Sequence, residues 1–419
     1  MDVHEYNLIR EIIAQNEDMR VILVGDDDQS IYEFRGAASK YMHKFIEEGA
    51  ERYELTENYR SKKNLVDFTN QWVAQLPNRL KRLPITAHDI HSGSIRICQY
   101  KSANLASPLV EDIRQTDLAG STCILTQTNP EAAQVTGLLT KYGIPNRLIQ
   151  SNEGFNLYNL KELRFFTDII VGKDDNPLVD DEIWATAKTQ LQELFRGSSK
   201  LEWCQIIIQD FEQINQIRKY KSDWQTFIRE SKLEDFVRIA GDVVFVSTIH
   251  KAKGKEFDNV FLLLDNFNST KDENKRQLYV GLTRAKSTLH VHYNGNYLQG
   301  LIADRLQYSF DNSSYAAPEC LTYALTHKEV YLDYFAYVQK RIVQIQSGDS
   351  LVYNADGLAN KNGELVLKFS NRFKEMIGLH EKRGYAIDQA KVNFCVYWKG
   401  PDSDREVQIL LPEVSFQKR

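Results

Sequence analysis

Four short segments bring together residue types that can bind phosphate groups and nucleic-acid bases. They cover residues 24–37, 55–61, 247–257 and 277–286. Guanidinium groups pair bidentately with phosphate oxygens, and aromatic rings stack on unpaired bases. The chemistry that these segments could perform is therefore phosphate recognition combined with contact to single strands.

The first segment reads Val-Gly-Asp-Asp-Asp-Gln-Ser-Ile-Tyr-Glu-Phe-Arg-Gly-Ala from position 24. An apolar run that ends in glycine and three aspartates predicts polar groups at the carboxyl edge of a sheet, where α/β proteins carry their sites. Gln29 could hydrogen-bond to a phosphate or to its attacking water. Tyr32 and Phe34 offer stacking surfaces, and Arg35 offers a cation for the backbone of a single strand. The alternative is an acidic turn followed by an ordinary pair of core aromatic residues.

The next two segments are weak when each is taken alone. Tyr59 and Arg60 could stack on adenine and pair with phosphate, but the dipeptide also fits an exposed helix N-terminus. From Thr248 through His250 to Gly254, a strand leads into a turn that would present backbone amides and lysines to phosphates. A solvated basic loop is the alternative for this segment.

The fourth segment, residues 277–286, places Arg284 on a predicted helix. An arginine held at such a position can stabilise the charge on a γ-phosphate as an arginine finger. The alternative is an ordinary surface arginine.

The elements that must position these segments alternate between strands and helices. Strands that are apolar along their whole length are typical of a buried parallel sheet, and their alternation with helices indicates an α/β fold. The pattern predicts helices at 5–16 and 62–76 and strands at 21–24, 95–100, 123–126, 243–246, 260–264 and 289–292, the last closing the series.

Between residues 151 and 241 the pattern becomes helical, and after residue 318 it changes again. Helices are predicted at 161–171, 181–195, 201–220 and 224–240, as an insertion between two halves of the α/β domain. Residues 318–419 predict a small α+β domain with strands at 364–369, 392–398 and 406–411 and a helix at 371–382, with Ser370 as its N-cap and Gly384 near its end. The aromatic stretch 331–337 favours a core role over a platform for stacking bases.

Composition limits the class of protein. The 419 residues carry a net charge of −5 and five cysteines, at 98, 123, 204, 320 and 395, with no CxxC pair. This pattern predicts a reduced cytoplasmic protein with neither a disulfide framework nor a structural zinc site, and no run of about 18 apolar residues suggests a membrane span. Residues 60–82 hold six cations and a single acid, which favours a solvated helix face.

In order, the four segments resemble motifs III, IV, V and VI of the UvrD/Rep/PcrA-like superfamily 1A DNA helicases. Residues 24–37 are similar to the family pattern VGDDDQSIYxWRGA, and residues 58–61 match its NYRS. Residues 250–257 match HxxKGxEF, and residues 279–285 match YVGxTRA. The resemblance covers roughly residues 5–300 and leaves the last hundred or so outside it.

The resemblance implies a role for each matching residue. Gln29 would sense the γ-phosphate, which Arg60 and Arg284 would also reach. Tyr59 would stack on the adenine, Glu256 would contact the ribose, and Gly254 belongs to the same nucleotide-facing turn. The residues expected to touch single-stranded DNA are Tyr32, Phe34, Arg35, Thr248 and His250. Phe34 replaces the family's usual tryptophan and Glu33 a residue that is often small, so the contact to DNA there could be weaker.

Two motifs of such helicases are absent from the 419 residues: a G-x-x-x-x-G-K-[ST] loop and a strand-end Asp-Glu pair. The expected fold is α/β, with a RecA-like parallel-sheet domain (helicase domain 2A) at 53–150 and 242–310. The expected flanking parts are a remnant of the first RecA-like domain (1A) at 1–52, a reduced helical 2B-like insertion at 151–241, and the α+β domain at 318–419.

The resemblance thus implies the C-terminal portion of an ATP-dependent 3′–5′ DNA helicase, with ATP and Mg²⁺ bound in the intact protein. The expected partners are single-stranded or partly duplex DNA and an upstream helicase segment, or another chain, that supplies the phosphate-binding loop. We expect the chain alone neither to hydrolyse ATP nor to unwind DNA. The alternative is a non-catalytic module that binds single strands or a protein partner. A nuclease is disfavoured, because the C-terminal residues show no clustered carboxylates with a lysine.

Overall fold

The computed structural model describes residues 1–16, 18–32, 36, 40–77, 79–149, 156–172, 176–231, 236, 243–400 and 405–419. The chain divides into two compact units. Unit 1 contains residues 1–135, 142–149 and 240–318, and unit 2 contains residues 136–141, 150–239 and 319–419. Segments of the two units therefore alternate along the chain, and each unit is assembled from segments that are separated in sequence.

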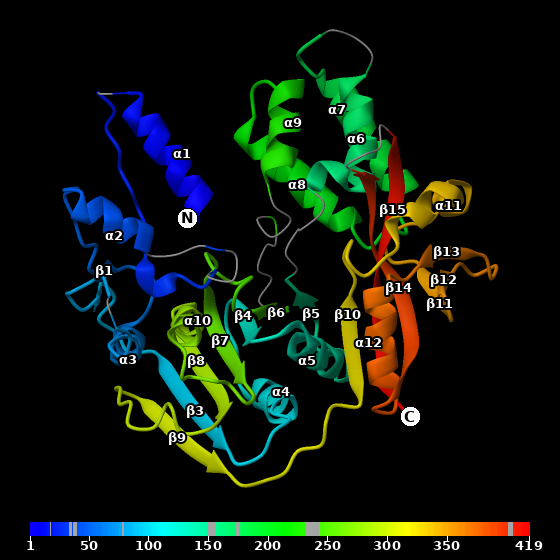
Figure 1. Ribbon diagram of the computed structural model, residues 1–419. Coiled ribbons are helices and arrows are strands. Elements are labelled where there is room, and N and C mark those ends of the chain that lie inside the picture. Colours follow the sequence, from blue (N-terminus) through cyan, green and yellow to red (C-terminus); the bar gives the residue numbers. More distant parts are fainter. Residues whose placement is uncertain are drawn as a thin grey trace. The chain divides into compact units, whose positions relative to one another are not determined.

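The centre of unit 1 is a seven-stranded sheet in the order β5-β6-β4-β7-β8-β3-β9, in which every paired neighbour is parallel. Helices α3 and α10 lie on one side of this sheet and α4 on the other (Figure 1). The strands are β3 (Ser94–Tyr100), β4 (Thr122–Thr126), β5 (Asn146–Leu148), β6 (Val244–Thr248), β7 (Phe257–Leu264), β8 (Ala285–Asn294) and β9 (Leu306–Asp311). The helices are α3 (Lys63–Val73), α4 (Ala106–Gln115) and α10 (Asp272–Leu282), with the first part of α5 (Asn129–Lys141), whose residues 136–141 belong to unit 2.

The central strands carry the hydrophobic core of unit 1. Every residue of β4 and β6 is buried, as expected for parallel strands that are covered on both faces. The prediction of an α/β parallel sheet with these strands is confirmed. The prediction that the series closes at residue 292 is wrong, because β9 adds a further strand beside β3. Most residues of β9 are exposed, and apolar and polar residues alternate along it, as expected for an edge strand.

The N-terminal segment of unit 1 forms a small helical layer. Helix α1 (Val3–Ala14) starts with a capping box, in which the Asp2 side chain accepts from the Glu5 amide and the Glu5 side chain accepts from the Asp2 amide. Tyr6 of α1 stacks on Tyr41 of α2 (Lys40–Glu47), with ring centroids 5.0 Å apart. The helix predicted at 5–16 is thus confirmed.

Residues 21–24 do not form the predicted strand. Within the described part of the chain no strand pairs with them, so their backbone groups lack the ladder that makes an apolar run a strand. Ile22 and Val24 are 88% and 86% exposed. All four residues of this apolar run are exposed. A 3-10 helix at Asp27–Gln29 follows, and the two-stranded parallel pair β1 (Glu57–Asn58) and β2 (Thr86–Ala87) comes later.

The helices of unit 2 pack around a cluster of aromatic side chains. Trp224 is fully buried, and its ring lies 5.2 Å from Phe166 and 5.6 Å from Trp184. The predicted helices are confirmed, although the third ends at Ile214 rather than at residue 220 and the fourth ends at Glu230 rather than at residue 240. Most of the predicted residues after 231 lie outside the described residues. The helices are α6 (Lys161–Val171), α7 (Asp181–Leu194), α8 (Leu201–Ile214) and α9 (Lys221–Glu230), preceded by a 3-10 helix at Leu157–Asn159.

An antiparallel sheet completes unit 2, in the order β10-β15-β14-β11-β12-β13. Ser370 caps α12 through a bond from the Phe373 amide to its hydroxyl, as predicted. In the aromatic stretch 331–337, Phe335 is buried in the core but Tyr337 is 84% exposed. The elements are β10 (Cys320–Ala324), α11 (Phe335–Ile342), β11 (Ser350–Asn354), β12 (Gly357–Ala359), β13 (Leu365–Lys368), α12 (Asn371–Glu381), β14 (Tyr385–Lys399) and β15 (Glu406–Lys418).

Buried polar contacts join the helices of unit 2 to its sheet, which the sequence did not indicate. The carboxylate of Glu162, at the start of α6, is completely buried and accepts hydrogen bonds from Ser198 (2.5 Å) and Ser347 (3.0 Å). Arg164 pairs with Glu406 at 2.5 Å. Residues that were expected as a separate insertion and a separate domain thus pack as one unit. No described helix is long and apolar enough to cross a membrane.

Candidate functional site

Gln29 and Arg284 meet in unit 1 although they belong to the first and last of the four motif segments. Gln29 lies at the end of the 3-10 helix, and its Nε2 donates to Oδ2 of Asp26 at 2.7 Å. This bond turns Oε1 towards Arg284, whose Nη2 donates to it at 3.2 Å. The contact brings the first and fourth segments together, as phosphate sensing by both residues requires.

The Arg284 side chain is held by the backbone of its surroundings. Only 1% of it is exposed, and its guanidinium donates to the carbonyl oxygens of Val280 (2.9 Å) and Lys255 (3.0 Å). Burial, and next the nearby charge of Arg60, lower the pKa of Arg284 to about 10. The group therefore still carries its charge at neutral pH. The alternative of an ordinary surface arginine is wrong.

Arg60 and Lys286 share the carboxylate of Glu256. Arg60 Nε lies 2.5 Å from one carboxylate oxygen, and Lys286 Nζ lies 2.9 Å from the other. Partial burial raises the pKa of Glu256, but the hydrogen bonds from Lys286 and Arg60 outweigh it and bring the pKa below its ordinary value. Arg60 Nη1 also donates to the carbonyl of Thr283, the residue next to Arg284. Two arginines thus lie beside each other at the end of α10, and one acid balances part of their charge.

Tyr59, which directly precedes Arg60 in sequence, presents its aromatic ring to solvent. Its side chain is 72% exposed, and it stacks on the His88 imidazole with ring centroids 4.5 Å apart. Its hydroxyl donates to Glu57 at 2.6 Å, and this hydrogen bond raises the pKa of Tyr59. The bond to Glu57 and the contact with His88 fix the position of the ring, and its exposed part is suited to stack on a planar base.

The residues expected to touch DNA lie together where they are described. Tyr32 donates from its hydroxyl to the His250 carbonyl at 3.0 Å, and the ring centroids of the two residues lie 6.1 Å apart. The ammonium group of Lys253 lies 5.1 Å from the centre of the Tyr32 ring. Thr248 ends β6 just before this turn and is only 7% exposed, so it can act on a strand mainly through its backbone. Phe34 and Arg35, like Glu33, lie outside the described residues.

The turn after β6 links the strand-facing and phosphate-facing residues. Lys253 Nζ donates to the Gln29 carbonyl at 2.8 Å. The next residue, Gly254, has a φ of +86° and open space where a Cβ would lie. Glycine is the residue that adopts this conformation without strain. The chain can therefore turn from Lys253 towards Glu256 within three residues.

Two of the three aspartates of the first segment bind cations of the same chain and the third binds a backbone amide, which the sequence did not indicate. Arg79 donates from Nε and Nη2 to the two carboxylate oxygens of Asp28, at 2.8 and 2.7 Å, and Lys81 Nζ donates to Asp26 Oδ1 at 2.6 Å. Asp27 accepts from the Leu80 amide at 2.7 Å. Arg79 and Lys81 are only 18% and 17% exposed, so the interpretation of residues 60–82 as a solvated face is wrong for these two. The excess of cations in residues 60–82 was the feature of the sequence that could have indicated these ion pairs.

Taken together, these contacts make a cationic site that is balanced by acids and amides of the chain. Arg60 and Arg284 each have a planar fork that suits a phosphate, but each is engaged, by Glu256 and by Gln29. A bound phosphate would have to replace or join these acceptors. A phosphate bound at the arginines can therefore affect the turn at Lys253, because Gln29 contacts both Arg284 and Lys253.

Comparison with protein families assigns most of the chain. The model of the UvrD-like helicase C-terminal domain matches residues 53–180 and 180–296. The model of the UvrD/REP helicase N-terminal domain matches residues 1–50. All four motif segments fall within these matches, and the C-terminal sheet lies beyond them.

Individual relatives agree with these matches. DNA helicase II of Haemophilus influenzae is 23% identical over 374 aligned residues, which take in 65% of this chain and 51% of that protein. DNA helicase II of Escherichia coli is 27% identical over 38% of the chain and 23% of that protein, and the ATP-dependent DNA helicase PcrA of Leuconostoc citreum is 24% identical over 45% and 27%. The chain thus spans about half or less of the length of these relatives. The solved C-terminal domain of a possible DNA helicase from Lactobacillus plantarum aligns with 60% of the chain and 98% of that domain at 15% identity, with a TM-score of 0.30, which is too low to inform the fold.

Proposed function

This chain belongs to the UvrD/REP helicase family, and on that premise we propose that it forms the arginine-bearing, strand-binding part of an ATP-dependent 3′–5′ DNA helicase or translocase. The observation that carries the proposal is the meeting of Gln29, Arg284 and, through Thr283, Arg60. These residues come from three motif segments and lie beside one another in unit 1.

We propose that ATP is bound with its terminal phosphate towards these arginines. The residues suit it: two guanidinium forks for phosphate oxygens, the exposed ring of Tyr59 for the adenine, and Glu256 for the ribose. Arg60 and Arg284 would neutralise the charge that develops on the outer phosphate, and Gln29 would orient the attacking water. Mg²⁺, when bound with the nucleotide, supplies further neutralisation of the phosphate charge. The loop that cradles the phosphates would come from an upstream helicase segment or another chain.

Single-stranded DNA would bind at Tyr32 and His250. The support is their mutual hydrogen bond and the Lys253 ammonium near the Tyr32 ring, which together offer a stacking surface and a cation for the backbone. Because Lys253 also contacts the Gln29 carbonyl, the same turn would couple the strand to the phosphate site. We include Phe34, Arg35 and Thr248 in this strand-binding surface on the basis of the family motif alone.

A fluorescent oligothymidine titrated with the 419-residue chain tests this part of the proposal by anisotropy. We expect saturable binding that weakens with salt, and a loss of about tenfold in affinity for Tyr32→Ala, since stacking contributes about 1–3 kcal/mol per base. Tyr32→Phe keeps the ring and should stay near the wild type. The control is Tyr337→Ala, which removes a tyrosine that is 84% exposed in unit 2. Absence of binding would overturn the assignment and favour a protein-interaction module.

We further propose that the helical insertion is a reduced form of the 2B subdomain. Since 65% of 419 residues is roughly 270, about 100 of the 374 positions aligned with the Haemophilus influenzae relative have no partner in this chain, and we propose that much of this shortening falls in the insertion. Fewer contacts to duplex DNA would then make an intact protein a better translocase than unwinding enzyme. Strong, processive strand separation by such a protein would contradict this.

A further inference from the structure

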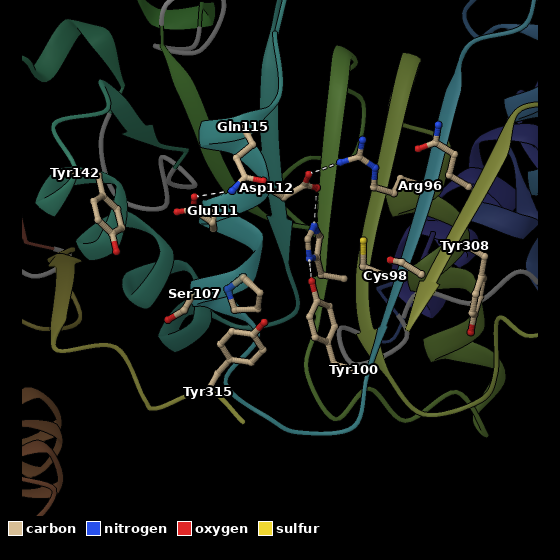
Figure 2. A pocket seen from close by; sticks show the side chains of 14 residues that line it. Arg96, Cys98, Tyr100, Ser107, Glu111, Asp112, Gln115, Tyr142, Tyr308 and Tyr315 are labelled. Atoms are coloured by element: carbon tan, nitrogen blue, oxygen red, sulfur yellow. Dashed lines mark hydrogen bonds and ion pairs between the residues drawn. The ribbon is translucent and has the colours of Figure 1, made fainter. Parts of the chain in front are cut away.

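A second polar cluster lies in unit 1, away from the four motif segments, between β3, β8 and α4. It lines a cavity of about 690 Å³, into which Cys98, Tyr100 and Asp112 point (Figure 2). The cavity is open to solvent at its rim, where Arg96 and Tyr308 are 38% and 47% exposed. The function proposed above uses none of these residues.

Three side chains of this cluster form a set of metal-ligating atoms. Cys98 on β3 and His292 on β8 are directly opposite each other in the parallel register, so their side chains leave the same face of the sheet. Asp112 comes down from α4 onto that face. The thiol sulfur, an imidazole nitrogen and a carboxylate oxygen all lie within 4.8 Å of one another. Thiolate, imidazole and carboxylate are ligands that zinc accepts together.

Outer groups hold two of these ligands in orientation. Asp112 Oδ2 lies 3.0 Å from His292 Nε2, and its other oxygen, Oδ1, lies 2.5 Å from Arg96 Nη1. Tyr100 bonds to Nδ1 of His292 at 2.8 Å, and His290 Nδ1 lies 2.7 Å from Asp112 Oδ2. An ionised carboxylate can only accept, so Nε2 carries the proton of a neutral His292 and Nδ1 accepts from Tyr100. Metal ligands in proteins are oriented by partners of this kind.

We propose that Cys98 Sγ, His292 Nε2 and Asp112 Oδ2 bind a divalent transition metal ion of the zinc type, with a water molecule from the cavity as the fourth ligand. Zinc bonds of about 2.0–2.1 Å to nitrogen and oxygen, at a tetrahedral angle, require these two atoms to be about 3.3 Å apart. The present 3.0 Å separation of Nε2 and Oδ2 needs to widen by only a few tenths of an ångström. The sulfur ligand favours zinc or cobalt over magnesium or calcium.

Binding would release one proton for each ion. The Cys98 thiol loses its proton to solvent, and the metal takes the place of the proton on His292 Nε2. The imidazole stays neutral, because Nδ1 now carries the proton and donates it to the Tyr100 oxygen. Thiolate and carboxylate together balance the charge of the ion. The ion would tie α4 to β3 and β8.

Titration of the metal-free 419-residue chain with Co²⁺ tests the site, since a tetrahedral cobalt–thiolate centre absorbs in both the visible and the near ultraviolet. We expect one Co²⁺ per chain, a thiolate charge-transfer band, and displacement of the ion by Zn²⁺. Cys98→Ser should abolish that band and Asp112→Asn should weaken binding at least tenfold. Cys320→Ser, which removes a free cysteine of unit 2, should leave both unchanged.

Folding of each variant is checked without metal by circular dichroism. If Cys98→Ser does not fold, X-ray absorption of the zinc-loaded wild type decides, since the proposal requires one sulfur among nitrogen and oxygen ligands. The absence of saturable binding, a spectrum unchanged in folded Cys98→Ser, or a zinc shell without sulfur would each overturn the proposal.

Discussion

The Arg284 guanidinium donates a hydrogen bond to the Gln29 side chain at 3.2 Å, across 255 positions of sequence. The same guanidinium donates to two backbone carbonyls, and it is almost completely buried. The position of Arg284 is thus fixed chiefly by the backbone, and Gln29 is the partner that a phosphate could replace.

Arg284→Lys should destabilise unit 1 far more than Gln29→Ala. A lysine cannot satisfy the carbonyls of Val280 and Lys255 from one position, so we expect a loss of about 2–3 kcal/mol in the free energy of unfolding. Gln29→Ala removes two partly exposed hydrogen bonds, one to Asp26 and one from Arg284, and should cost about 1 kcal/mol. Hydrogen exchange of the amides in β4 and β7 under urea measures both. Equal losses would contradict the account.

Removing Arg79 should destabilise the segment that carries Gln29. Asp28 is 1% exposed, and among the described residues Arg79→Met would leave its buried carboxylate with only the more distant Lys81 contact at 3.5 Å. Breaking a buried pair in this way costs about 3–5 kcal/mol. Adding Asp28→Asn should recover part of the loss. As a control, Lys63→Met breaks an exposed pair with Asp67 and should leave the stability nearly unchanged.

Glu131 should make unit 1 more stable at pH 5 than at pH 8. Burial raises the pKa of its carboxyl to about 7, although bonds from Thr128 and Gln127 oppose this, and Asp265 adds to the rise. Because the folded pKa lies above the unfolded value, the contribution is complete below the unfolded pKa of about 4.5 and is lost as the pH rises through 7. The expected loss is roughly 3 kcal/mol at most.

The matched variant for this effect is Glu131→Gln, whose amide oxygen can still accept from the Gln127 and Thr128 amides. Urea unfolding of the wild type and the variant between pH 5 and 8 gives the comparison. The variant should lack this pH dependence and be the more stable protein at pH 8. A wild-type stability that rises between pH 5 and 8 relative to the variant would show that the carboxyl is favoured in its ionised form.

Glu162 should be required for the stability of unit 2. Ser198 and Ser347 both donate to its Oε1, and the residue is fully buried. Glu162→Ala would leave two buried hydroxyl groups and a cavity, with an expected cost of about 3 kcal/mol. Glu162→Gln keeps an acceptor at the same place and should cost about 1 kcal/mol. Thermal unfolding of unit 2, followed by the fluorescence of Trp224 and Trp184, distinguishes the two; equal costs would argue against the serine contacts.

The sequence predicted the elements whose signal is local. The strands β4, β6 and β7 are continuous apolar runs, and α12 has both its Ser370 cap and a glycine after its end. The four motif segments could be recognised because their residue types follow each other at fixed spacing. Their meeting in space, seen in the contact between Gln29 and Arg284, agrees with the parallel sheet that the pattern indicated.

Features that depend on distant partners could not be predicted. An apolar run such as 21–24 becomes a strand only beside another strand, and none of the described residues provides one. Polar and apolar residues alternate in the edge strand β9, so it lacks the continuous apolar run that marks a buried strand. Arg79 and Asp28 are 51 positions apart, so nothing local pairs them. The same holds for Cys98 and His292, which only the strand register brings together.

The most direct test of the account is ATP turnover by the purified 419-residue chain, with and without single-stranded DNA, alongside Arg284→Lys. The arginine side of the site is proposed to act on a nucleotide that another segment cradles. We therefore expect the chain to bind the strand but to show no DNA-stimulated hydrolysis above background in either protein. Clear DNA-stimulated turnover by the wild type that Arg284→Lys abolishes would contradict this, because the chain would then hold the whole phosphate site itself.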